Sequence, residues 1–235
     1  MKLTENQIDE LFKFTRKHYV YHYDVQSELV DHLANDIEEI WVTQPLLTFE
    51  QARDKSFKKF GVFGFMDVIE AKQKQMNKRY LRIMWRFFRE WFSFPKLVTT
   101  LGVFLLFFCI LKMPYAKYIL LSLLFILVVF DLRKQTIARK SHKIKTIKKE
   151  KIFLLEEMIT GARNSFSGLL FINVFNSMNA FRVSFNSMEN HWLLLISFSL
   201  TVVVLLFYVT GFLIPQKAEE LLQETYPEYK MVNNM

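Results

Sequence analysis

The sequence predicts an all-α integral membrane protein with four transmembrane helices and an N-terminal cytoplasmic helical domain. Three observations lead to this fold class: long apolar runs, Lys and Arg concentrated on one side of them, and a polar N-terminal segment with helical periodicity. The apolar runs are Leu97–Leu111, Tyr115–Phe130, Phe166–Phe185 and Trp192–Ile214. A hydrocarbon core about 30 Å thick takes about 20 helical residues, and flanking aromatic and Lys residues extend the first two runs toward this length.

The distribution of basic residues predicts that both termini are cytoplasmic. Cytoplasmic loops of membrane proteins carry an excess of Lys and Arg. The chain contains 31 Lys and Arg residues and has a net charge of +8, and basic residues gather before the first run and between the second and third. The other two connections hold Lys112 and Lys117 in one and Glu189 in the other. The start of the chain lacks an apolar segment, so no cleaved signal peptide is expected.

These features divide the chain into six predicted parts. They are a cytoplasmic three-helix domain (1–62), a basic amphipathic juxtamembrane helix (63–94), a transmembrane helical hairpin (95–132), a basic cytoplasmic connection (133–164), a second transmembrane helix pair (165–215) and a cytoplasmic tail (216–235). Pro114 favours a turn within the hairpin, and Pro215 is expected to end the fourth helix. The charged residues after the second run are expected to continue that helix as a stalk, and a short interfacial helix is expected over 152–159.

The N-terminal domain is expected to contain three helices. Apolar residues recur with helical spacing over 4–20 and 24–43. Thr4 and Thr48 are each followed three residues later by Gln, which is the pattern of a capping box at the start of a helix. Gly61 suits a left-handed backbone after the third helix. The segment therefore reads as a small helical domain with its own core.

A motif in this segment resembles a known family. Its parts are Glu28-Leu29-Val30-Asp31-His32-Leu33, then Ile37-Glu38-Glu39, Phe49-Glu50-Gln51-Ala52 and Lys59-Phe60-Gly61. Residues 5–62 resemble the HAAS domain, also called a permease-prefix domain, with Glu28, Leu29, His32, Leu33 and Gly61 as the signature residues. The chain departs from the commonest form at Gln44-Pro45-Leu46, where a glycine-containing turn is usual.

The resemblance implies a cytoplasmic, non-catalytic module attached to membrane helices. Such modules belong to bacterial membrane proteins and are often encoded beside PadR-like regulators or transport components. We therefore expect the chain to lie in a bacterial cytoplasmic (inner) membrane as a multi-pass protein. Its expected partners are a second copy of the chain or another membrane protein.

The predicted juxtamembrane helix carries a line of arginines. Arg79, Arg82, Arg86 and Arg89 are spaced three, four and three residues apart, which places their side chains along one helical face. A basic amphipathic helix of this kind is typical of a surface that contacts anionic lipid headgroups of the inner leaflet. The simpler interpretation is that these residues are ordinary anchors on the cytoplasmic side. No nucleic-acid partner is expected, because the positive charge lies where membrane topology requires it.

The third apolar run is interrupted by polar residues. Asn173, Asn176 and Ser177 are expected to share one face of the helix. This intramembrane polar face has two interpretations, an association surface between helices or a lining for a transport pathway. Association is favoured, because no Asp, Glu or His accompanies the amides within the membrane to form an ion or proton relay.

No catalytic, cofactor or metal site is predicted. His18 with His22, and Glu28 with His32, have the spacing of paired zinc ligands on a helix, but no H-E-x-x-H string occurs. The expected function is therefore a non-enzymatic, regulatory or assembly role of the cytoplasmic domain. The alternative is a small transporter or an accessory subunit of an ABC-type permease, which would use the polar face of the third run.

Overall fold

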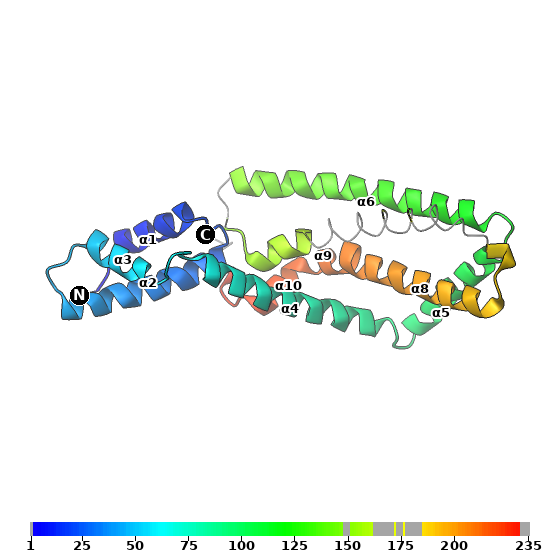
Figure 1. Ribbon diagram of the computed structural model, residues 1–235, viewed down its shortest axis with the longest axis horizontal. Coiled ribbons are helices and arrows are strands. Elements are labelled where there is room, and N and C mark those ends of the chain that lie inside the picture. The colour runs from blue at the N-terminus through cyan, green and yellow to red at the C-terminus, as the bar shows by residue number, and fades with distance from the viewer. Residues whose placement is uncertain (1, 148–150, 162–171, 173–175, 177–184, 231–235) are drawn as a thin grey trace. The chain divides into compact units, whose positions relative to one another are not determined.

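The computed structural model describes residues 2–147, 151–161, 172, 176 and 185–230. Within these residues the secondary structure is helical throughout, which confirms the all-α prediction (Figure 1). The chain forms two compact units. The first contains Met1–Arg79 and Lys149–Glu157, and the second contains Tyr80–Lys148 and Met158–Met235.

The first unit is built on the three predicted N-terminal helices. They are α1 (Glu5–Lys17), α2 (Tyr23–Thr43) and α3 (Phe49–Lys58). Both predicted capping boxes are present: the Thr4 hydroxyl accepts from the Gln7 N–H, the Thr48 hydroxyl accepts from the Gln51 N–H, and each Gln side chain accepts from the backbone of its Thr. These local hydrogen bonds satisfy backbone donors that a helix N-terminus otherwise leaves unpaired.

α2 is the central helix of this unit, because it packs against both α1 and α3. Its apolar stripe is buried along its length, and the side chains of Leu29, Leu33 and Ile37 are fully enclosed. Leu11 of α1 and Ala52 of α3 are enclosed in the same way. Leu29 and Leu33, two residues of the motif that resembles the HAAS signature, therefore belong to the core of this unit.

A glycine-containing turn leads from α3 into the long helix α4 (Met66–Glu90). Gly61 has φ of +78° and Gly64 has φ of +56°, so the expected left-handed backbone at Gly61 is confirmed. A Cβ at Gly64 would also lie 3.0 Å from the Phe57 ring, so a larger residue here would crowd that ring in addition to straining the backbone. α4 continues from the first unit into the second as one uninterrupted helix.

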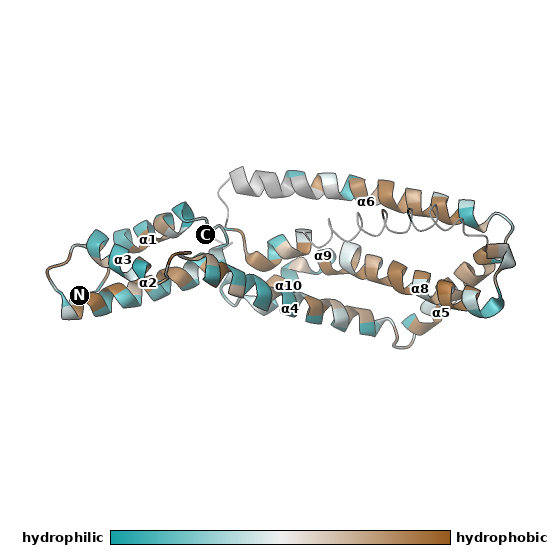
Figure 2. Ribbon diagram, in the orientation of Figure 1, coloured by the Kyte–Doolittle hydropathy of each residue, from teal (hydrophilic) through white to brown (hydrophobic). Residues whose placement is uncertain are grey.

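The second unit contains the predicted hairpin. Helices α5 (Lys96–Leu111) and α6 (Ala116–Ile147) are separated by the turn at Pro114, and α5 packs against α6 and against α8 (Asn190–Tyr208). A buried cluster that includes Phe107, Leu111 and Leu193 joins them. α6 runs on well beyond its apolar part, as expected for the stalk. Figure 2 shows apolar residues along α5, α8 and the first part of α6.

The last apolar helix ends at Gln216, one residue after Pro215, so its predicted end is confirmed to within one residue. After α8 the helix continues through a π-helical turn, η2 (Val209–Leu213), and through α9 (Ile214–Gln216), before α10 (Ala218–Thr225) begins. In the wider turn the Ile214 N–H donates to the Val209 carbonyl five residues back. A proline lacks an N–H and its ring crowds the carbonyl four residues earlier, so a π-helical turn just before it lets the helix continue.

Among the described residues, one helix is long and apolar enough to span a membrane. It is the continuous stretch Asn190–Gln216, with 27 residues. α5 is apolar but shorter, with 16 residues, and rises about 24 Å along its axis. The third predicted run, 166–185, lies almost entirely outside the described residues.

Candidate functional site

A segment from the middle of the chain completes the first unit. Residues 151–157, which we call the strap, were expected to form part of a basic connection outside the N-terminal domain. The structure instead assigns this segment to the same compact unit as α1–α3. Phe153 and Leu155 are fully buried and Leu154 is nearly so. The unit therefore extends beyond the predicted boundary at residue 62.

The strap is held by the first residues of α2. The Tyr23 N–H donates to the Ile152 carbonyl at 2.8 Å, and the Leu154 N–H donates to Asp24 Oδ1 at 3.0 Å. Because residues 154–161 form a helix, the Asp24 carboxylate caps the N-terminus of a helix that lies far away in sequence. His22 Nε2 lies 2.5 Å from Glu157 Oε2.

Aromatic contacts add to these hydrogen bonds. The Phe153 ring meets the Tyr23 ring edge to face, with centroids 5.5 Å apart, and the Tyr23 ring stacks on Phe12 of α1 at 6.1 Å. The Lys151 ammonium lies 4.5 Å from the centroid of the Tyr23 ring. A charged and an apolar strap residue thus contact the same tyrosine, which makes Tyr23 the centre of the docking site.

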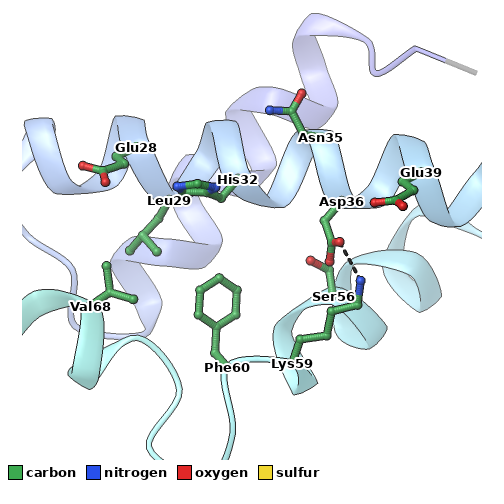
Figure 3. A pocket seen from close by; sticks show the side chains of 10 residues that line it. All are labelled: Glu28, Leu29, His32, Asn35, Asp36, Glu39, Ser56, Lys59, Phe60 and Val68. Carbon is green, nitrogen blue, oxygen red and sulfur yellow. Dashed lines mark hydrogen bonds and ion pairs between the residues drawn. The ribbon is translucent and has the colours of Figure 1, made fainter.

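A hollow of about 440 Å³ opens on the first unit beside α2 (Figure 3). We call it the groove. Its lining comes from α2, from the end of α3 and from α4: Glu28, Leu29, His32, Asn35, Asp36, Glu39, Ser56, Lys59, Phe60 and Val68. In Figure 3 the Phe60 ring points into the space between the helices. Seven of these ten residues are polar or charged, so the groove offers mainly hydrogen-bonding and ionic groups.

Ion pairs organise the charged groups around the groove. Glu28 pairs with Lys72 of α4, and Asp36 Oδ1 lies 2.6 Å from Lys59 Nζ. His32 and Glu39 are exposed on the same side of α2. The signature residues thus divide into two groups: Leu29 and Leu33 pack in the core, whereas Glu28 and His32 line the groove. Gly61 lies in the turn that follows α3.

The Asp36 carboxylate gives the first unit a defined response to pH. Partial burial raises its pKa, but the hydrogen bond and charge of Lys59, with a contribution from the Ser56 hydroxyl, lower the pKa below its ordinary value of 3.8. The folded state therefore binds this proton more weakly than the unfolded chain does. The resulting stabilisation is present above pH 3.8 and is lost as the pH falls through the folded pKa.

We expect Asp36→Asn to lower the free energy of unfolding of the first unit at about pH 7 and to have a much smaller effect at about pH 3. Denaturant titrations can follow Trp41 fluorescence in a chain whose other tryptophans are replaced by Phe. Trp41 is buried, and its indole N–H donates to the Leu47 carbonyl. An effect of equal size at both pH values would contradict this assignment.

The histidines considered as zinc ligands have other roles in the structure. His18 Nδ1 donates to the Phe14 carbonyl at 2.9 Å, and its ring lies between Phe14 and Phe57. His22 is engaged by Glu157 of the strap. In the described part of the chain, no group of three or more His, Cys, Asp or Glu side chains is arranged to hold a metal ion.

The arginine line of α4 is split by its surroundings. Arg86 makes a two-pronged ion pair with Glu224 of α10, with N–O distances of 3.2 and 3.3 Å. Arg82 and Arg89 are exposed, and Arg79 is partly exposed in the first unit. Trp85 is 59% exposed beside them. Arg86 therefore differs from the other three predicted lipid-contacting arginines, because its guanidinium already pairs with a carboxylate.

Of the three residues of the predicted polar face in the third run, the structure describes one. Asn176 is helical and exposed, whereas Asn173 and Ser177 lie outside the described residues. Its two interpretations therefore stay open as predictions.

Comparisons of the chain with models of protein families, with curated proteins and with solved structures find no match. The likeness of residues 5–62 to the HAAS domain therefore rests on the sequence motif. The sequence predicts a short interfacial helix over 152–159, and residues 154–161 are helical. That residues 151–157 belong to the N-terminal unit was not predicted.

Proposed function

We propose that this is a non-enzymatic, multi-pass protein of a bacterial cytoplasmic (inner) membrane, whose N-terminal domain has a regulatory or assembly role. In this proposal both termini are cytoplasmic and the four apolar runs cross the bilayer. The partner of the domain is a second copy of the chain or another membrane protein.

Exposed apolar side chains support the membrane assignment. A soluble protein buries its most apolar helices, but only 33% of the most apolar stretch of Asn190–Gln216 is buried. Large apolar side chains are also exposed on α5 and on the first part of α6, two helices outside the stretch Asn190–Gln216. They include Leu101, Leu105, Leu106, Phe125, Ile126 and Val129. Exposed apolar area on several neighbouring helices suits contact with lipid.

Aromatic residues at the helix ends support the same assignment. Tyr115 and Tyr118 near the start of α6, and Trp192 near the start of α8, are exposed. At the opposite end of α8, the Tyr208 ring lies 5.3 Å from the Trp91 ring at the end of α4. Tyr and Trp are typical of the two membrane–water interfaces, where their rings are amphipathic.

The strap is the observation that carries the regulatory role. It belongs to the connection between the second and third apolar runs, and its Phe153 is fully buried in the N-terminal unit. A simple appended domain would be joined to the membrane helices through α4 alone. Here the unit also holds the connection between two predicted spans, so a partner that binds the unit acts on a segment joined directly to them.

The groove is the proposed partner site. It carries Glu28 and His32 of the HAAS-type signature, and we propose that the first unit belongs to that class of module. Two of its carboxylates, Asp36 and Glu28, are held in ion pairs with Lys59 and Lys72, and this charged, exposed surface suits recognition of another protein surface.

A photocrosslinking experiment on the full chain in its native membrane tests this proposal. A benzophenone amino acid is placed at position 32 in the groove or, as a control, at Val42, which is exposed on the same helix outside the groove. We expect an adduct from position 32, with a second copy of the chain or with another membrane protein, and none from position 42. No adduct from position 32, or equal adducts from both positions, would argue against the groove as partner site.

A further inference from the structure

The exposed side of α4 in the second unit combines apolar and basic residues. With 100° between successive residues, Leu81 and Trp85 share one sector of α4, and Arg82 and Arg89 lie next to it. Phe92 follows in the turn, two residues after the end of α4. All five side chains are exposed. An apolar strip bordered by guanidinium groups suits the boundary between acyl chains and phosphate headgroups. We call these five residues the interfacial face.

Arg86 lies at the far edge of this basic sector and is turned toward α10. Its guanidinium contacts both carboxylate oxygens of Glu224, and this carboxylate raises the pKa of Arg86. Leu221 and Leu222 of α10 are buried. Lys217, just before α10, lies 5.4 Å from the centroid of the Phe87 ring on α4.

A carboxylate and a lipid phosphate offer a guanidinium the same two-oxygen geometry. The Glu224 carboxylate therefore binds the Arg86 guanidinium with the geometry that a headgroup phosphate would use. α10 also presents Glu219 and Glu220, which an anionic surface repels. We propose that α10 is an intramolecular competitor of anionic phospholipid: Arg82 and Arg89 accept headgroup phosphates, while Glu224 withholds Arg86 from them.

This inference rests on the proposed membrane location and adds a regulatory contact to it. The C-terminal helix sets how strongly the α4 face holds anionic lipid. A change that moves Glu224 away from Arg86 adds a third guanidinium to the lipid-binding surface.

Two charge-matched variants test the competition. Glu224→Gln removes the carboxylate that holds Arg86, and Glu219→Gln makes the same change of net charge at an exposed site on a different face of α10. An exposed ion pair contributes little to stability, so both chains are expected to fold. The full chain, reconstituted in nanodiscs of neutral phosphatidylcholine, is titrated with phosphatidylglycerol, and bound lipid is counted by native mass spectrometry.

We expect Glu224→Gln to bind phosphatidylglycerol several-fold more tightly than Glu219→Gln, and we expect the double variant Arg86→Gln/Glu224→Gln to lose that gain. Inorganic phosphate at equal concentration should not displace the lipid; displacement would identify free phosphate as the ligand and overturn the lipid assignment. Equal binding by the two single variants, or a gain that survives without Arg86, also overturns the proposal. If the chain enters nanodiscs but shows one of the contrary results, only the competition proposal fails and the membrane assignment is unaffected. If the chain does not enter nanodiscs at all, the membrane assignment itself is contradicted.

Discussion

Replacing Phe153 by Ala should destabilise the N-terminal unit by about 3–5 kcal/mol, although this residue lies 91 positions beyond residue 62, the predicted end of that domain. Phe153 is 0% exposed and packs against Tyr23. Its removal leaves a cavity and takes away the main apolar anchor of the strap. A loss of this size is a large share of the stability of a small domain.

Hydrogen exchange of the α1 and α2 amides, measured on the full chain in nanodiscs, reports this loss. The matched control is Phe63→Ala, because Phe63 belongs to the same unit but is 72% exposed. We expect the control to change the opening free energy by less than about 0.5 kcal/mol. If Phe153→Ala leaves α2 exchange as slow as the control does, the strap is not part of the core of this unit.

Placing a lysine on the exposed face of α8 should block its insertion into a membrane. Phe198 is 56% exposed, so a soluble protein would tolerate Phe198→Lys or even gain solubility. In a bilayer the same change costs about 3 kcal/mol near the centre of the span, because a charge replaces an apolar group in hydrocarbon. Phe125→Lys on α6, where Phe125 is 62% exposed, applies the same test to a second predicted span.

Glycosylation sites placed on either side of each helix measure the inserted fraction in a microsomal translation assay. Phe63→Lys serves as the control with the same chemical change, since Phe63 lies outside the apolar runs. We expect insertion to fall for the α8 and α6 variants and to stay unchanged for the control. Unchanged insertion in all three variants would mean that the side chains at positions 198 and 125 do not face hydrocarbon.

Most helices were predictable, because their signals are local. The capping boxes at Thr4 and Thr48, the apolar stripe of α2 and the left-handed Gly61 each depend on residues a few positions apart. Helical spacing and short-range hydrogen bonds can be recognised in a sequence without knowledge of the partner surface. Pro215 is a further local signal, because the last apolar helix ends one residue after it, at Gln216.

The candidate site was only partly predictable. Glu28 and His32 were singled out from a motif, and the structure places both on the groove. The motif did not distinguish them from Leu29 and Leu33, which pack in the core. Arg86 was grouped with three other arginines by its spacing, but its carboxylate partner Glu224 lies 138 positions away.

The sequence by itself determined that the chain is helical, where its apolar runs lie and which residues are charged. The tertiary structure alone decided that the strap belongs to the N-terminal unit and that Glu224 pairs with Arg86. The physical reason is range. Helix formation depends on neighbours three or four residues apart, whereas Asp24 caps Leu154 across 130 positions and His22 meets Glu157 across 135. Which of many similar carboxylates and backbone groups become partners over such distances depends on how the helices pack together.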